Sequence, residues 1–203
     1  MKIISHTIIL LFIVCLFSDR FAYGQTEEES LHATLSLGYS HIYNYELNPS
    51  EKINGNLVRA DVILTLEKFL FESDYQHIFV KNSDKYFVHN SIGYKFFSGE
   101  YLPKTYVLVS HIYANKFPQD GLLYNENHRG FGFGGLFKMN IEYLLNGDAS
   151  FAVTYFPSDK IFYKNMQVGW DLKVIGISVG GIGIRVPDGR YYSGFIFQLR
   201  HKW

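Results

Sequence analysis

The chain has 203 residues, of which 47% are hydrophobic and 19% are charged. This composition can bury one domain-sized core and shows no bias toward disorder. Lysine plus arginine and aspartate plus glutamate both number 19, so the net charge is zero and no basic surface predicts a nucleic-acid partner.

Residues 1–24 predict a secretory signal peptide. A lysine precedes an apolar run over 8–17, and small residues stand just before Gln25, which together mark a signal and its cleavage site. The apolar run is too short to cross a bilayer, which weighs against the alternative of an uncleaved anchor. Cys15, the single cysteine, lies within this run, so the mature domain at 25–203 is expected to fold without disulfides.

From residue 31 onward, apolar and polar residues alternate with a period of two, the pattern of strands with one apolar face. Within 61–80 the apolar positions change from even to odd. This change needs a break in the strand, and a tight hairpin at Glu67-Lys68 supplies it. Ten strands follow, or eight if the weakest pair merges. The expected ranges are 31–47, 56–67, 68–80, 86–97, 103–116, 129–144, 149–156, 160–174, 177–186 and 190–203.

The expected connections differ in length between the two sides of the sheet. The longest, "KFPQDGLLYNENHR", falls on one side and the shortest, "EK", on the other. Outer-membrane barrels show this asymmetry, with short turns in the periplasm and longer loops outside. The longest connection is the expected recognition element, because loops commonly carry function.

The C-terminal sequence "YYSGFIFQLRHKW" places apolar and aromatic residues on one face of the last expected strand. It resembles the terminal strand of bacterial outer-membrane β-barrel proteins, in which a final aromatic residue and alternating apolar residues are recognised by the barrel-assembly machinery. His201 departs from the usual apolar residue two positions before the end. The matching residues are Phe195, Phe197, Leu199 and Trp203.

This resemblance covers the whole mature chain and implies an all-β fold, a closed antiparallel up-and-down transmembrane barrel. It also implies the outer membrane of a Gram-negative-type bacterium, with membrane lipid and the barrel-assembly machinery as partners. Alternation alone does not decide whether the apolar face points in or out, so a soluble barrel that binds an apolar ligand stays open. The aromatic content of 18% and strands of about ten to fifteen residues favour the membrane barrel.

Charged residues recur in the middle of the expected strands, on the face opposite the aromatics. A barrel of eight to ten strands has an interior nearly filled by side chains, so we expect no general diffusion pore. Buried charges of opposite sign usually pair, and the prediction is an ion-paired network in the lumen, with a polar-ligand or proton site as the alternative. Its expected members are Arg59, Asp61, Glu72, Asp74, Lys95, Lys138, Glu142, Asp171, Lys173 and Arg200, with Gln76, Asn140 and Lys202 on the same face.

An enzymatic alternative rests on "VHNSIG", where His89 and Ser91 share a face, as a base and a nucleophile on a strand would. The pair resembles the His-x-Ser-Asn motif of barrel enzymes that deacylate lipid A, although Ile92 stands where that family has Asn. "SHIYANKFPQDG" resembles the same region in its His111, but Tyr113 stands in place of the nucleophilic serine.

Other motifs predict no cofactor and no metal. "GFGFGG" at 130–135 has the glycine spacing of a dinucleotide site, but a strand pattern follows it instead of a helix, so these glycines are expected to relieve crowding in a curved strand. The eight histidines lack metal-ligand spacing. The leading prediction is therefore a structural or surface-interaction role in the membrane.

Overall fold

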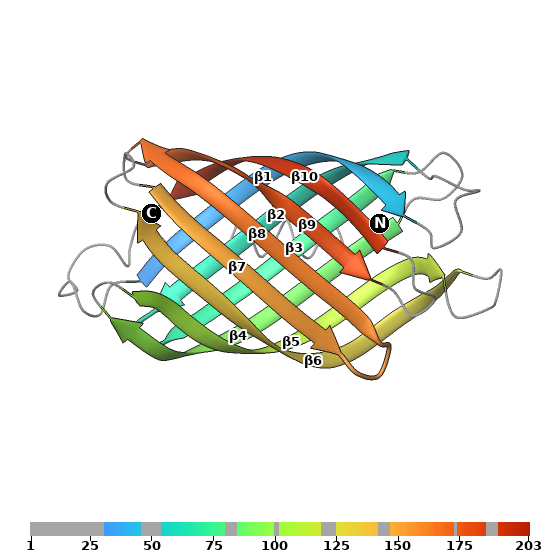
Figure 1. Cartoon of the computed structure of the whole chain (residues 1–203), viewed down its shortest axis with the longest axis horizontal. Coiled ribbons are helices and arrows are strands. Elements are labelled where there is room, and N and C mark those ends of the chain that lie inside the picture. The colour runs from blue at the N-terminus through green and yellow to red at the C-terminus, as the bar shows by residue number, and fades with distance from the viewer. Residues whose placement is uncertain are drawn as a thin grey trace.

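The computed structural model describes residues 31–45, 54–79, 85–99, 102–118, 125–141, 147–172, 174–185 and 191–203. These residues form ten strands that close into one antiparallel barrel, each paired with its neighbours in the chain and β1 paired with β10 (Figure 1). The predicted all-β, closed, up-and-down barrel is confirmed. The strands are β1 Leu31–Tyr45, β2 Asn54–Leu66, β3 Phe69–Phe79, β4 Lys85–Gly99, β5 Leu102–Pro118, β6 Asn125–Ile141, β7 Gly147–Phe156, β8 Ile161–Leu172, β9 Ile175–Arg185 and β10 Tyr191–Lys202.

The described residues contain no helix that is long and apolar enough to cross a membrane.

The chain ends and the tight turns distinguish the two ends of the barrel. We call the end that carries Leu31, Trp203 and the turn at Glu67-Lys68 the terminal end, which lies on the left in Figure 1. We call the opposite end, which carries the turn at 157–160, the loop end.

The predicted hairpin at Glu67-Lys68 is confirmed at the terminal end. Leu66 pairs with Phe69 across the turn, and Glu67 takes a left-handed conformation with φ +48°, which a two-residue hairpin demands. The turn therefore explains why the apolar positions change parity between β2 and β3.

The connection between β5 and β6 is shorter than the sequence predicts. Beyond an irregularity after Ala114, pairing resumes between Phe117 and Glu126 and between Pro118 and Asn125. Pro118 can occupy this strand end because its missing N–H is tolerated there. Alternation is absent from this stretch, so inter-strand pairing, which local pattern does not reveal, extends both strands.

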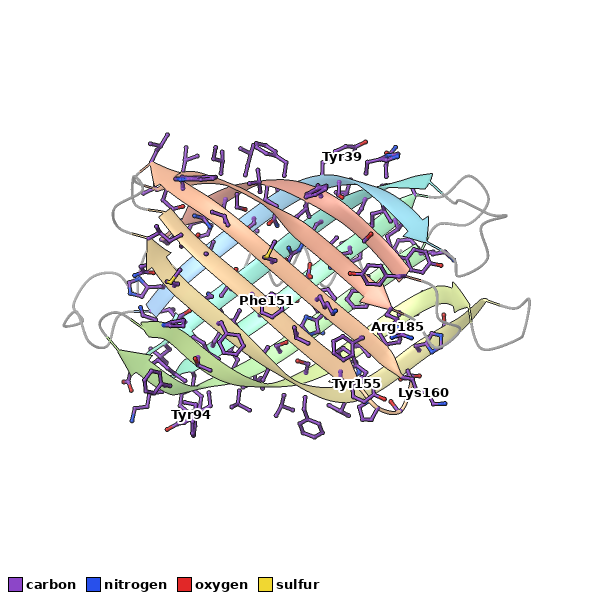
Figure 2. The ribbon with its side chains drawn as sticks, in the orientation of Figure 1. Tyr39, Tyr94, Phe151, Tyr155, Lys160 and Arg185 are labelled. Atoms are coloured by element: carbon purple, nitrogen blue, oxygen red, sulfur yellow. The ribbon has the colours of Figure 1, made fainter. Side chains whose placement is uncertain are left out.

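The outer wall is apolar and the interior is largely polar. Leu37, Phe131 and Phe195 expose 58%, 68% and 86% of their surface, whereas the interior residues Arg59 and Asp74 are fully buried. Figure 2 shows Tyr39 and Tyr94 projecting away from the ribbon. This arrangement is the reverse of that in a soluble barrel and fits a wall surrounded by hydrocarbon, so the predicted outward direction of the aromatic faces is confirmed.

Candidate functional site

The centre of the lumen holds a hydrogen-bonded carboxylate, Asp74 on β3. Arg59 Nε donates to its Oδ1 at 2.8 Å, and Gln76 Nε2 donates to its Oδ2 at 2.7 Å. Tyr163 on β8 also donates its hydroxyl to Oδ2, at 2.6 Å. Because β3 and β8 lie on opposite sides of the ring, this last bond spans the lumen.

The same network continues toward the terminal end through Asp61. Its Oδ1 lies 3.4 Å from Arg59 Nε and accepts from Gln198 Nε2 at 2.6 Å, which links β2 to β10. Glu72 lies at the edge of the network, 3.9 Å from Arg59 Nη2. One buried guanidinium thus faces three carboxylates, and close hydrogen bonding offsets the cost of burying these charges.

A second ionic cluster lies near the terminal end. Arg200 Nε and Nη1 donate to Asp171 Oδ1 and Asp148 Oδ1, both at 2.8 Å, and Lys202 bonds both carboxylates. Gly169 makes room for Arg200, because a Cβ at that position would lie 2.4 Å from the guanidinium. The cluster borders a polar vestibule of about 300 Å³, lined also by Lys138 and Trp203.

Most of the charged residues predicted for the lumen are thus brought together in two clusters. Arg59, Asp61, Glu72 and Asp74 form the central one, and Asp171 and Arg200 belong to the terminal one. Lys95 belongs to neither; it lies at the terminal end of β4, where its N–H donates to the carbonyl of Lys68 at 2.7 Å. Glu142 and Lys173 lie outside the described residues.

Sequence reasoning missed three polar partners, Tyr163, Gln198 and Asp148. Tyr163 shares the inward register of Asn165 and Asp171 on β8. The period-two alternation of β8 therefore predicts an inward Tyr163, but aromatic residues were not considered for the interior. Asp148 was assigned to a connection, but it pairs with Asn140 inside the barrel wall. A tyrosine, a glutamine and a further carboxylate therefore complete the two clusters that the predicted charged residues form in part.

Sequence reasoning also missed an apolar layer that fills the lumen at the loop end. We call it the plug. Its members come from strands around the ring, and Leu57, Phe87 and Phe156 are fully buried. Phe87 stacks on Tyr163 with ring centroids 5.3 Å apart, and the Tyr163 hydroxyl bonds Asp74, so Tyr163 joins the plug to the polar network. The plug comprises Ile42, Leu57, Ile78, Phe87, Ile112, Ala114, Phe156, Ile161, Tyr163, Ile182, Ile184, Tyr192 and Ile196.

The candidate catalytic pair lies inside the lumen beneath the plug. Ser91 Oγ is 3.0 Å from His89 Nε2 and 2.8 Å from Ser110 Oγ. Among the described residues, the buried His89 Nδ1 has no hydrogen-bond partner, so no acid orients the ring as a triad would require. His89 is fully buried and Ser91 is 3% exposed, so both side chains are packed within the barrel.

The candidate residues of the two stretches that resemble lipid A deacylases point to opposite sides of the wall. Strand β5 packs beside β4, with Asn90 opposite His111, so His111 shares the outward register of Asn90 while Ser91 points inward. On the outer wall, Ser73 donates to Asn90 Oδ1 at 2.8 Å, and these side chains with His111 border an apolar hollow of about 310 Å³.

The C-terminal residues occupy the outer wall at the barrel's closing seam. Phe195, Phe197 and Leu199 are 86%, 49% and 56% exposed. Trp203 exchanges backbone hydrogen bonds with Ala33 at 3.0 and 3.3 Å, which extends the β1–β10 pairing to the last residue. Recognition of this segment by assembly machinery stays a prediction.

The described residues contain no group of three metal-ligating side chains. In the motif at 130–135, an added Cβ at Gly132 or Gly134 would lie 2.4 or 2.3 Å from carbonyl oxygens of β7. The expected role of these glycines in relieving crowding therefore agrees with the geometry.

Solved structures to which this barrel is similar include three outer-membrane β-barrels. Neisserial surface protein A is 12% identical, with 86% of this chain and 100% of that chain covered and a TM-score of 0.47. The KdgM porin, solved with disordered oligogalacturonate, is 9% identical, with 82% and 98% covered and a TM-score of 0.37. The translocator domain of the autotransporter NalP from Neisseria meningitidis is 9% identical, with 98% and 97% covered and a TM-score of 0.37. No protein-family model matches the chain, and no curated protein matches it significantly.

Proposed function

We propose that this chain is an integral β-barrel of a bacterial outer membrane, with a structural or surface-interaction role and a lumen that conducts no solutes. The observation that carries the proposal is the closure of the interior. Phe87, Phe156 and Asp74 have no exposed surface, whereas residues that line a water-filled channel stay partly exposed. Closure leaves the outer wall and the loops as the surfaces through which the protein acts.

The membrane placement is supported by the apolar outer wall. Phe96 and Phe131 expose 75% and 68% of their surface, and burying such side chains in hydrocarbon is strongly favourable. The strand lengths of 10 to 17 residues are sufficient for tilted strands to cross a bilayer.

The first test is cell fractionation followed by electrophoresis of boiled and unboiled samples. We expect recovery in the outer membrane and a mobility that changes on heating, because a hydrogen-bonded barrel resists detergent until it is heated. Recovery in the soluble fraction would overturn the membrane placement.

The second test measures conductance. Planar bilayers containing the purified protein should show no stepwise conductance, and regular openings would overturn the closed lumen.

Lipid modification is the second candidate, favoured by the short distance between Ser91 Oγ and His89 Nε2. The buried position of both residues argues against it. We expect Ser91→Ala to leave the lipid composition of the cell envelope unchanged, because the serine is buried and its hydroxyl is hydrogen-bonded to Ser110 and His89. Mass spectrometry of extracted lipids from deletion, wild-type and Ser91→Ala cells gives the readout. A lipid change shared by the deletion and the variant would establish catalysis instead.

A further inference from the structure

The outer wall at the loop end carries a one-sided group of basic residues. Arg129 on β6, Lys160 in the 157–160 turn, Lys164 on β8 and Arg185 on β9 are all exposed. We call these four residues the basic rim. Figure 2 shows Lys160 and Arg185 at the same end of the wall, beside Tyr155.

The register of the strands brings the rim together with an aromatic row. Tyr155, Phe162 and Arg185 are direct neighbours across β7, β8 and β9, and the rings of Tyr155 and Phe162 lie 5.8 Å apart. Lys164 follows two positions along the same face of β8, with Nζ 5.4 Å from the Phe162 ring centroid. Arg129 lies 5.0 Å from the Tyr113 ring centroid. Arg129 and Lys164 thus stand over aromatic rings at the edge of the apolar wall.

Among the described residues, no carboxylate forms an ion pair with a rim cation. Asp159 Oδ1 in the turn lies 3.1 Å from His128 Nδ1, and Asp159 Oδ2 accepts a hydrogen bond from Ser158 Oγ at 2.9 Å. The described residues of β1 and β2, by contrast, include no lysine, arginine, aspartate or glutamate among their outward side chains at this end, and His41 Nδ1 bonds Asn56 Oδ1 at 3.0 Å. Within the part of the loop end that the structure describes, the positive charge of the outer wall is therefore concentrated on the β6–β9 side.

We propose that the basic rim binds the phosphate groups of a lipid headgroup in the leaflet that surrounds the loop end. The inference rests on the proposed function, since it needs the wall to lie in a membrane. Four cations match a headgroup with two phosphate monoesters, each of which carries about −1.5 to −2 charges at neutral pH. A phosphodiester lipid, with a single charge, would leave most of the rim uncompensated. The aromatic row provides the apolar contact that the lipid needs next to its headgroup.

The test measures lipid retention by the full mature barrel. The purified protein in detergent is titrated with bisphosphorylated lipid A, with monophosphorylated lipid A and with zwitterionic phosphatidylcholine, and adducts are counted by native mass spectrometry. We expect affinity to fall in that order. Lys164→Gln/Arg185→Gln should weaken binding of bisphosphorylated lipid A by roughly tenfold or more, because two charge-assisted contacts are lost.

The matched control is Lys68→Gln/Lys104→Gln, which removes the same charge at exposed positions of the terminal end; it should bind lipid A like the wild type. Equal affinity for all three lipids, or equal weakening in both double variants, would overturn the proposal. Inorganic phosphate in excess should not displace the lipid, and displacement would indicate a site for free anions instead. Heat-dependent mobility recorded on the same samples separates loss of the lipid from loss of the barrel, on which the proposed function depends.

Discussion

At the scale of single residues, Asp74 concentrates the interactions that hold the interior together. It accepts hydrogen bonds from Arg59, Gln76 and Tyr163, and it is completely buried. Breaking a buried ion pair costs more than the pair itself contributes, since the remaining partner keeps an uncompensated charge. The carboxylate therefore makes the opposite walls of the barrel depend on one another.

Asp74→Asn is expected to lower the free energy of unfolding by about 3 kcal/mol, because Arg59 loses its closest counter-charge while it stays buried. Denaturant titration of the protein folded into lipid vesicles measures the loss. Asp159→Asn, at the turn, is the control and should cost less, since an asparagine at this position can still hydrogen-bond His128 and Ser158. Similar losses in the two variants would contradict the central role of Asp74.

Gly180 and Gly181 offer a matched pair of neighbours on β9. A Cβ at Gly180 would lie 2.0 Å from the carbonyl oxygen of Met166, whereas a Cβ at Gly181 meets nothing within 4 Å. Gly180→Ala should therefore destabilise the barrel by about 1–3 kcal/mol, because the backbone of β8 must move. Gly181→Ala should be neutral or slightly stabilising. The same denaturant titration compares the stabilities of the two variants. Equal stabilities would show that the β8 backbone moves away from the added Cβ without destabilising the barrel.

At the scale of elements, the seam between β1 and β10 decides whether the ring closes. Twelve residue pairs join the two strands, from Thr34 with Lys202 to Tyr45 with Tyr191, and the Trp203 backbone adds its bonds to Ala33. An unclosed seam would leave strand edges unpaired in hydrocarbon, which no stable membrane protein tolerates.

Deleting Trp203 is expected to lower the fraction of protein that reaches the heat-modifiable form in the outer membrane. The deletion removes both the backbone bonds to Ala33 and the terminal aromatic ring. Trp203→Ala keeps the backbone bonds and isolates the contribution of the ring, while Trp203→Phe should assemble like the wild type. Normal assembly of the deletion variant would show that the last residue carries no assembly signal.

At the scale of the whole molecule, the lumen is layered along its axis. The plug fills the loop end, the Asp74 network crosses the middle, and the polar vestibule opens at the terminal end. Each layer needs side chains from strands on opposite sides of the ring, so the layers also fix the shape of the barrel.

Shortening the plug should open the barrel. Phe87→Ala/Phe156→Ala removes two fully buried rings from the loop end and lets water reach the polar Asp74 network, which then remains as the barrier across the middle. Because a hydrated polar layer seals less well than packed rings, we expect small stepwise conductances in planar bilayers where the wild type shows none. Phe131→Ala, which removes an exposed ring from the outer wall, is the control and should stay closed. A double variant that folds and remains as closed as the wild type would show that the plug does not seal the lumen.

Much of this architecture could be predicted from the sequence by itself. The ten strands, the hairpin at Glu67-Lys68 and the division of each strand into an apolar and a polar face follow from period-two alternation, because a strand's faces depend only on local order along the chain. The outward direction of the apolar faces is favoured by the aromatic content and the strand lengths. The same parity placed Arg59, Asp61 and Asp74 in the lumen. The extension of β5 and β6 could not be predicted, because it rests on pairing where alternation fails.

Tertiary structure alone decided which side chains meet across the barrel. Asp74 and Tyr163 are 89 residues apart, and their contact depends on the stagger of strands around the closed ring, which local periodicity does not encode. The plug, the separation of Ser91 from His111 by the wall, and the gathering of the basic rim have the same origin. Alternation fixes the face on which a residue lies, whereas closure of the barrel fixes its height along the axis and its neighbours.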